Sequence, residues 1–86
     1  VWTGVLDYFP DALMEVSRIS KIGNDQHHKG KPLHWDKSKS TDHLDALTRH
    51  LLQARELDED GCMHLSKVAW RALAALQDYI DKNGKG

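Results

Sequence analysis

The sequence predicts a small all-α fold built from three helices. Apolar residues recur at spacings of three and four in three separate segments, which is the pattern of amphipathic helices. No segment alternates apolar and polar residues with the period of two that a half-buried strand requires. The chain has 86 residues, which suits one domain, and we expect residues 1–86 to form it.

The N-terminal part of the chain predicts an arm followed by a helix. Residues 1–9 mix aromatic residues with Gly4 and predict an extended arm or a short turn. Pro10 suits the first turn of a helix, where its missing N–H group costs nothing. We therefore predict a helix from about 10 to 28. Because the chain begins with Val1, we also expect a natural N-terminal segment to precede it.

Two further helices are predicted after a long polar loop, at about 41–57 and 62–81, with an acidic turn at 58–61 between them. A loop as long as the one before the middle helix usually has a function in so small a protein. Each of these helices has an apolar face that predicts the core. The residues of these faces are Leu44, Leu47, Leu51 and Leu52 in the middle helix, and Leu65, Ala69, Ala72, Leu73, Leu76 and Ile80 in the last.

Composition excludes several classes of function. Twelve basic and thirteen acidic residues nearly cancel, so the sequence lacks the basic footprint of a protein that binds duplex nucleic acid. One cysteine, Cys62, allows no intrachain disulfide and no four-cysteine zinc site. No apolar run approaches the ~20 residues of a membrane span. These features predict a cytoplasmic protein without a membrane partner. A domain of this size is marginal alone, so we also expect a homo-oligomer.

The middle helix carries acids with the spacing of a cation site. Asp42, Asp45 and Arg49 stand at i, i+3 and i+7 and so share one helix face. Two carboxylates one turn apart can share a hard cation such as Mg²⁺, which prefers oxygen ligands. The same spacing is common on solvated helix faces, where it reflects only an Asp–Arg pair. His50, near the end of this helix, is either a substrate ligand or a cap for its carbonyl groups.

The last helix repeats the arrangement with cations. His64, Lys67 and Arg71 lie on one side of it. Arg binds a phosphate through its planar fork and Lys as a point charge, so this side could hold a di- or triphosphate. A solvated basic face is the alternative.

The first helix and the loop contribute further candidate ligands. Glu15 stands beside the apolar core face of its helix, where a carboxylate needs a metal or a partner, and Arg18 is the simplest partner. Trp35 in the loop could stack on a purine base or cover the core. Phosphoanhydride hydrolysis needs no enzyme nucleophile, because metal-bound water and charge neutralisation suffice.

Several blocks of residues occur along the chain in a fixed order: GNDQH from Gly23, PLHW from Pro32, KSTDH from Lys39, RHL from Arg49 and AWRAL from Ala69. In these blocks the chain resembles the phage dATP/dGTP diphosphohydrolase family, also called MazZ, of the MazG-like all-α nucleotide pyrophosphohydrolases. The resemblance extends from about Gly4 to Tyr79. The EExxE helix of the wider MazG group is represented only by Glu15, and its ExxD element by Asp42 to Asp45.

The resemblance implies an all-α MazG-like domain that is completed by oligomerisation, as a homodimer or homotetramer. It implies hydrolysis of a purine (deoxy)nucleoside triphosphate to the monophosphate and pyrophosphate with Mg²⁺ or Mn²⁺, in the host cytoplasm if a phage encodes the chain. The alternative is a phage protein that binds and sequesters a nucleotide without cleaving it. The expected catalytic residues are Glu15, Asp42 and Asp45, which with His64 are also the expected metal ligands. The expected substrate-binding residues are Asn24, His27, Trp35, Lys39, Arg49, His50, Lys67 and Arg71.

Overall fold

The computed structural model describes residues 1–27 and 42–84. In these residues the fold is all-α, as predicted, and no strand is present among them. The elements are a short helical turn η1 (Trp2–Leu6) and the helices α1 (Pro10–His27), α2 (His43–Leu52) and α3 (His64–Asn83). No helix of the described part is both long and apolar enough to cross a membrane.

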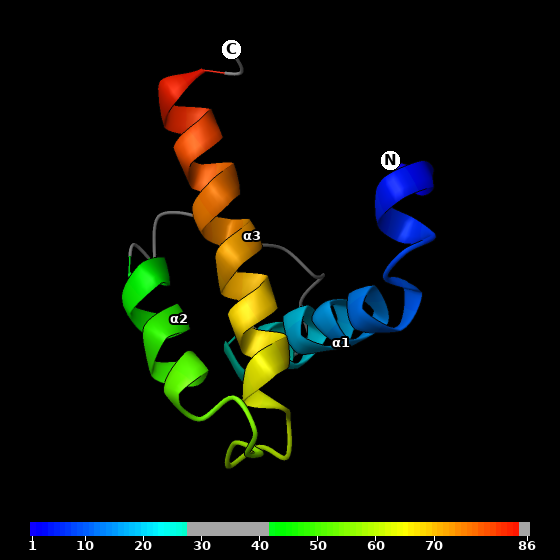
Figure 1. Cartoon of the computed structure of the whole chain (residues 1–86). Helices are drawn as coiled ribbons and strands as arrows, with labels where there is room; N and C mark the ends of the chain where they lie inside the picture. Colours follow the sequence, from blue (N-terminus) through cyan, green and yellow to red (C-terminus); the bar gives the residue numbers. More distant parts are fainter. Residues whose placement is uncertain (28–41, 85–86) are drawn as a thin grey trace.

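Helix α3 is the central element, because both α1 and α2 pack against it (Figure 1). His50 of α2 contacts His64 at the start of α3, and His43 of α2 contacts Arg71 two turns further along. The residue numbers therefore run in opposite directions across the contact, and α2 and α3 form an antiparallel helical hairpin.

The N-terminal residues form a turn rather than an extended arm. Gly4 adopts a φ of +90°, which only glycine accepts at little cost, and its N–H donates a 2.8 Å hydrogen bond to the carboxylate of Asp7. The turn projects away from the three helices (Figure 1). Pro10 occupies the first position of α1, in agreement with its missing N–H group.

Helix α2 ends five residues before its predicted end, at Leu52, because the chain turns back on itself there. The N–H of His64 donates to the carbonyl of Glu56, and Asp58 N–H donates to Cys62 O at 2.7 Å. These hydrogen bonds join the two sides of the connection between the helices, so that it forms a closed loop. Helix α3 accordingly begins at His64, two residues later than predicted, after an extended Met63.

The helical hairpin is held by small and polar residues, and most of the predicted core leucines are exposed. The buried residues of α2 are His43 and Ala46, and those of α3 are His64, Ser66 and Ala74. The predicted core faces are therefore wrong for this chain alone. The exposed members of those faces are Leu44, Leu51, Leu52, Leu65, Ala72, Leu73 and Leu76.

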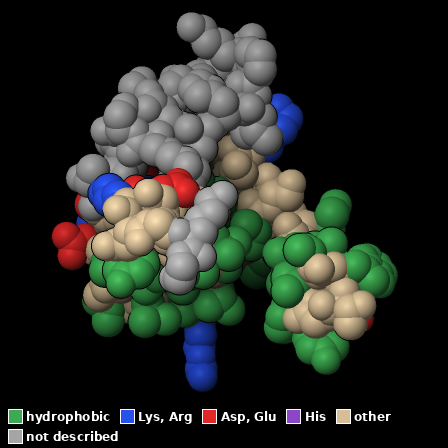
Figure 2. All heavy atoms as spheres, turned by 90° about the horizontal axis from the view of Figure 1, so that it is seen from above, with side chains coloured by type: hydrophobic (Ala, Val, Ile, Leu, Met, Phe, Trp, Pro, Cys, Tyr) green, Lys and Arg blue, Asp and Glu red, His purple; other side chains and the backbone are tan. Residues whose placement is uncertain are grey.

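On α3 these exposed residues form one stripe. Leu65, Leu73, Leu76 and Tyr79 fall within about 120° of the helix circumference, opposite the buried Ala74. Figure 2 shows hydrophobic side chains gathered along one side of the molecule, and another group around the N-terminal turn at the right. Exposed Trp2 belongs to this turn, and exposed Phe9 lies between the turn and α1. In the described chain, many large hydrophobic side chains are therefore exposed, whereas the buried hydrophobic residues are the small Ala46, Cys62 and Ala74.

We predict that the α2–α3 contact tolerates no added volume at Ala46. This side chain is fully buried, so Ala46→Leu should lower the free energy of unfolding by about 1–3 kcal/mol through overpacking. Urea unfolding followed by circular dichroism measures the loss. The control is Ala12→Leu on the exposed face of α1, which should change the same quantity by no more than about 0.5 kcal/mol. Equal effects of the two substitutions would contradict a close α2–α3 contact at Ala46.

Candidate functional site

Several candidate functional side chains gather along the contact between α2 and α3. We call this contact the hairpin seam and define it by His43, Ala46 and His50 on α2 with His64 and Arg71 on α3. The three α2 residues are spaced at i, i+3 and i+7, so they share the face that meets α3. Polar groups lie at both ends of the seam, and the buried methyl group of Ala46 lies between the two histidines of α2. The seam therefore has two polar centres, one beside the loop and one at the start of α2.

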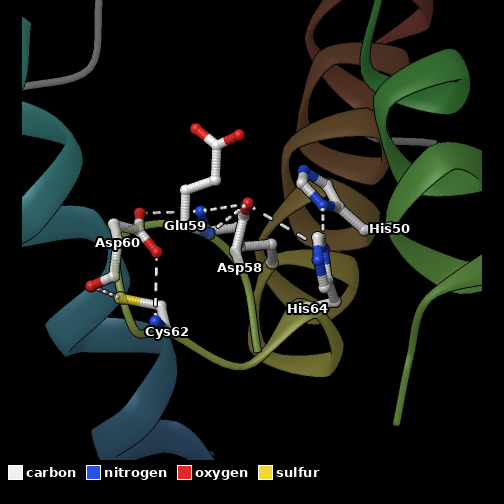
Figure 3. Close-up of polar contacts among 7 residues, drawn as sticks. His50, Asp58, Glu59, Asp60, Cys62 and His64 are labelled. Carbon is white, nitrogen blue, oxygen red and sulfur yellow. Dashed lines mark hydrogen bonds and ion pairs between the residues drawn. The ribbon is translucent and has the colours of Figure 1, made fainter. Parts of the chain in front are cut away.

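The first polar centre joins His50, Asp58 and His64 (Figure 3). His50 Nδ1 lies 2.8 Å from His64 Nδ1, so one imidazole donates a proton that the other accepts. Asp58 Oδ2 lies 3.9 Å from His64 Nδ1. One ligand atom from each of the three residues lies within 4.8 Å of the other two. No other group of three His, Cys, Asp or Glu residues in the described part of the chain is as close.

Lys67 links this centre to the loop. Its ammonium donates to Asp58 Oδ2 at 2.7 Å and to Asp60 Oδ2 at 2.8 Å. Burial alone would lower the pKa of Lys67, but the hydrogen bonds and charges of Asp58 and Asp60 raise it overall. The same hydrogen bonds hold the pKa of both carboxyl groups below their usual range. Lys67 is therefore an ammonium held between two carboxylates at neutral pH.

Cys62 belongs to this loop, and its side chain is buried. Its N–H donates to the carboxylate of Asp60 at 3.0 Å, and burial raises the pKa of its thiol. A thiol with a raised pKa is a poor nucleophile. Gly61 has a φ of +79°, which allows the tight turn in which the N–H of Cys62 reaches the carboxylate of Asp60.

The second polar centre lies at the start of α2 and combines Asp42 with two arginines. Arg49 Nη2 lies 3.8 Å from Asp42 Oδ2, and Arg71 Nη1 lies 4.0 Å from Asp42 Oδ1. Arg71 also contacts His43 Nδ1 at 3.1 Å, and its guanidinium lies 5.5 Å from the ring centre of Trp70. Both arginine groups thus gather around one carboxylate that is half exposed.

An open hollow adjoins this second centre and has a volume of about 350 Å³. Three carboxylates line it: Asp42 and Asp45 from the start of α2, and Asp78 from the second half of α3. Lys82 also lines it and pairs with Asp78 at 3.0 Å, one helical turn away. The exposed ring of Tyr79 forms part of the rim. The hollow therefore offers oxygen ligands, a cation and an aromatic face to a solute.

The structure brings together only some of the residues that the sequence singles out. Asp42 and Asp45 share the hollow, with Arg49 and Arg71 beside Asp42. Glu15 belongs to no three-residue group with these acids in the described chain, and pairs instead with Arg18 at 3.0 Å. His50, His64 and Lys67 meet at the first polar centre. Asn24 is buried on α1 and His27 ends that helix, whereas Trp35 and Lys39 lie outside the described residues.

Sequence reasoning missed three of the acids. The sequence predicts only an acidic turn at Asp58 and Asp60, although an acidic run just before a helix that begins with a histidine is a detectable signal. Asp78 belongs to the polar side of a long helix, and nothing in the sequence distinguishes it from Asp81. Only the antiparallel packing places it opposite Asp45.

The two centres fit different metal ions. Mg²⁺ is usually held by one or two carboxylates together with water and substrate phosphates, and Asp42 and Asp45 in the hollow suit that requirement. Two imidazoles and one carboxylate, as at His50, Asp58 and His64, suit first-row transition metals instead.

The pH dependence of stability should carry a contribution from His50. Partial burial, and then the charges of His64 and Lys67, lower the pKa of His50 from its ordinary 6.5. The unfolded chain therefore takes up this proton more readily, so the contribution is complete above pH 6.5 and is lost as the pH falls below it. We predict that His50→Gln flattens the decline of the free energy of unfolding between about pH 7.5 and about pH 5. Parallel pH profiles of parent and variant, measured by urea unfolding with a chelator present, would refute this.

Comparison with known proteins identifies the family. The family model described as dATP/dGTP diphosphohydrolase, N-terminal, matches residues 3–85, which is nearly the whole chain. Comparisons with curated proteins and with solved structures gave no match. The description of the family supports hydrolase activity on nucleotides at the level of the family. The chain therefore belongs to the dATP/dGTP diphosphohydrolase N-terminal family.

Proposed function

We propose that this chain is a metal-dependent pyrophosphohydrolase that acts on purine (deoxy)nucleoside triphosphates and releases the monophosphate and pyrophosphate. The observation that carries the proposal is the family match over residues 3–85. The polar centre at the start of α2 and the hollow beside it supply the groups that such a reaction needs.

The arginines at the start of α2 are the proposed phosphate ligands. Arg49 and Arg71 lie at 3.8 and 4.0 Å from Asp42, which is longer than a hydrogen bond. An incoming phosphate chain offers acceptors with more charge, so either guanidinium can turn from Asp42 to a phosphate in a bidentate contact. Arg49 is well exposed and needs no rearrangement of the helices to do so. Lys82 is a further cation at the same hollow.

Asp42 and Asp45 are the proposed ligands of Mg²⁺ or Mn²⁺. When bound, the ion supplies charge neutralisation of the phosphates and lowers the pKa of a water molecule. The two carboxylates lie in the first turn of α2, or just before it, and both face the hollow. Their own task is to fix the position of the phosphate chain relative to Arg49 and Arg71. Glu15 joins them in this proposal only if it leaves Arg18.

Recognition of the base is proposed for Asn24, His27 and Trp35, and phosphate binding for Lys39. Asn24 is buried in the last part of α1. Lys67 is a weaker candidate for phosphate binding than the sequence indicates, because Asp58 and Asp60 already hold its ammonium. His50 is likewise engaged with His64, away from the hollow.

A homo-oligomer is proposed to cover the stripe of exposed apolar side chains on α3. Burying apolar surface stabilises a complex by about 25 cal/mol per Å². Leu73 and Leu76 are each more than half exposed, in the middle of a helix whose other face is packed. Large contiguous apolar patches of this kind usually mark interaction sites.

We predict that Asp45→Asn lowers kcat for pyrophosphate release from dATP or dGTP by about 100-fold or more, because one of two metal-binding carboxylates is lost. The assay measures pyrophosphate from each dNTP with Mg²⁺ or Mn²⁺. The matched control is Asp11→Asn, which changes an exposed acid in the first turn of α1 and should leave kcat unchanged.

Equal activity of the parent chain and Asp45→Asn would remove Asp45 from the mechanism. Tight nucleotide binding without pyrophosphate release by the parent would instead select the alternative function, a protein that sequesters nucleotides. In the described chain, the close group of three potential metal ligands contains none of Glu15, Asp42 and Asp45, an observation that favours this alternative.

We predict that Leu73→Glu dissociates the oligomer, since a buried carboxylate at an apolar interface is costly. Light scattering should give a multiple of the chain mass of 9.8 kDa for the parent and the mass of a single chain for the variant. Ser17→Glu, at an exposed position on α1, serves as the control and should keep the parent mass. A single-chain mass for the parent itself would refute the proposed oligomer.

A further inference from the structure

Three side chains from three different elements converge beside the loop of the helical hairpin (Figure 3). His50 comes from the last turns of α2, Asp58 from the loop, and His64 is the first residue of α3. We propose that His50, Asp58 and His64 bind a first-row transition-metal ion such as Zn²⁺, at a site separate from the carboxylates of the open hollow. This ion would fasten the two helices of the hairpin together at their loop end.

The donor set selects the class of ion. Two imidazole nitrogens and one carboxylate oxygen are ligands typical of Zn²⁺ and its neighbours, which bind nitrogen well, whereas Mg²⁺ prefers oxygen ligands alone. Three protein ligands leave a fourth position of a tetrahedral ion for water. The ligand atoms come from positions 50, 58 and 64, so the ion would close the loop between α2 and α3.

The distances require only a small adjustment. Two nitrogens on one tetrahedral ion with bonds of about 2.0–2.1 Å stand about 3.3 Å apart. The two Nδ1 atoms lie 2.8 Å apart, as suits a hydrogen bond between the rings. An ion would therefore replace the shared proton and separate the rings by about half an ångström. Asp58 is already next to His64, at 3.9 Å.

The charges around the site are compatible with a divalent ion. Asp58 and Asp60 carry two negative charges against the one positive charge of Lys67, so this group is net negative before the ion binds. Lys67 keeps Asp60 as an acceptor, at 2.8 Å, while Asp58 serves the ion. His64 is buried, whereas Asp58 and His50 are partly exposed, so the ion can enter from the loop side.

A purely structural role is the competing explanation. In that case the chain of hydrogen bonds from His50 through His64 to Asp58 and Lys67 only orders the loop, and no ion binds. The two explanations are distinguished by a direct measurement, because only a metal site binds Zn²⁺ with an affinity that depends on these three side chains.

The test is competition between the whole chain and a chromophoric zinc chelator, in the absence of nucleotide. The parent should bind Zn²⁺, and His50→Ala and Asp58→Asn should each weaken this affinity by about tenfold or more through loss of one ligand. Two matched controls should stay within about twofold of the parent. His43→Ala removes the other histidine of α2 in the seam, and Glu59→Gln removes the exposed acid next to Asp58 in the same loop.

The experiment is carried out in a background in which His27, His28 and His34 are all replaced by alanine, so that the three histidines that precede α2 in the sequence contribute no ligand. Zn²⁺ should also raise the melting temperature of the parent and of both controls, but not that of His50→Ala or Asp58→Asn, since an ion that binds only the folded chain stabilises it. If His50→Ala fails to fold, Asp58→Asn in the loop decides the outcome.

Three results would overturn the proposal: no Zn²⁺ binding by the parent, equal binding by Asp58→Asn and Glu59→Gln, or displacement of Zn²⁺ by an equal concentration of Mg²⁺. Since no substrate is present, these results leave the proposed pyrophosphohydrolase activity untouched. Loss of that activity in Asp45→Asn would likewise say nothing about the histidine site.

Discussion

The antiparallel contact between α2 and α3 is the constraint on which the rest of the structure depends. It is narrow, because the side chain at its centre is the methyl group of Ala46, and the histidines on either side of it are buried or half-buried. Close approach of the two helices brings His50 to His64 at one end and His43 to Arg71 at the other. Since helices are rigid over this length, both polar centres are set by one packing arrangement.

The polar residues of the hairpin seam contribute little hydrophobic stabilisation and need partners for their buried groups. Burying imidazole and carboxylate groups is tolerated only where each finds a partner, and here they find one another. Lys67 shows how this is achieved: its ammonium, which is mostly buried, is held by two carboxylates, and its hydrogen bonds lower the pKa of both carboxyl groups. These contacts orient the loop, and they gain little from the hydrophobic effect. The described chain therefore has a small apolar core, whose fully buried members are Ala46 and Cys62.

The apolar stripe of α3 is the counterpart of this polar seam. A helix with one face packed on polar neighbours still carries its leucines, and Leu65, Leu73 and Leu76 are left facing away from α1 and α2. Exposure of such residues is unfavourable in water. The packing that forms the polar seam therefore also leaves the apolar stripe that the proposed association of chains would cover. The hollow with Asp42 and Asp45 lies at the far end of the same hairpin from the histidine centre, so the proposed phosphate chemistry and the proposed metal site draw on different residues.

Periodicity and turn residues in the sequence by themselves determined the all-α fold, the order of its helices, the start of the first helix at Pro10 and the acidic turn before the last helix. Local spacing also placed Asp42 with Arg49, since helix geometry fixes which residues of one helix share a face. Only the tertiary structure decided that Asp78 joins Asp45 at the hollow, that His50 meets His64, and that Asp58 and Asp60 hold Lys67. It also decided that the polar side of α2 packs inward while Leu44 and Leu51 face outward. The physical reason is that an amphipathic pattern identifies two faces of a helix, whereas the choice of the packed face depends on which partner surfaces the other helices bring within reach.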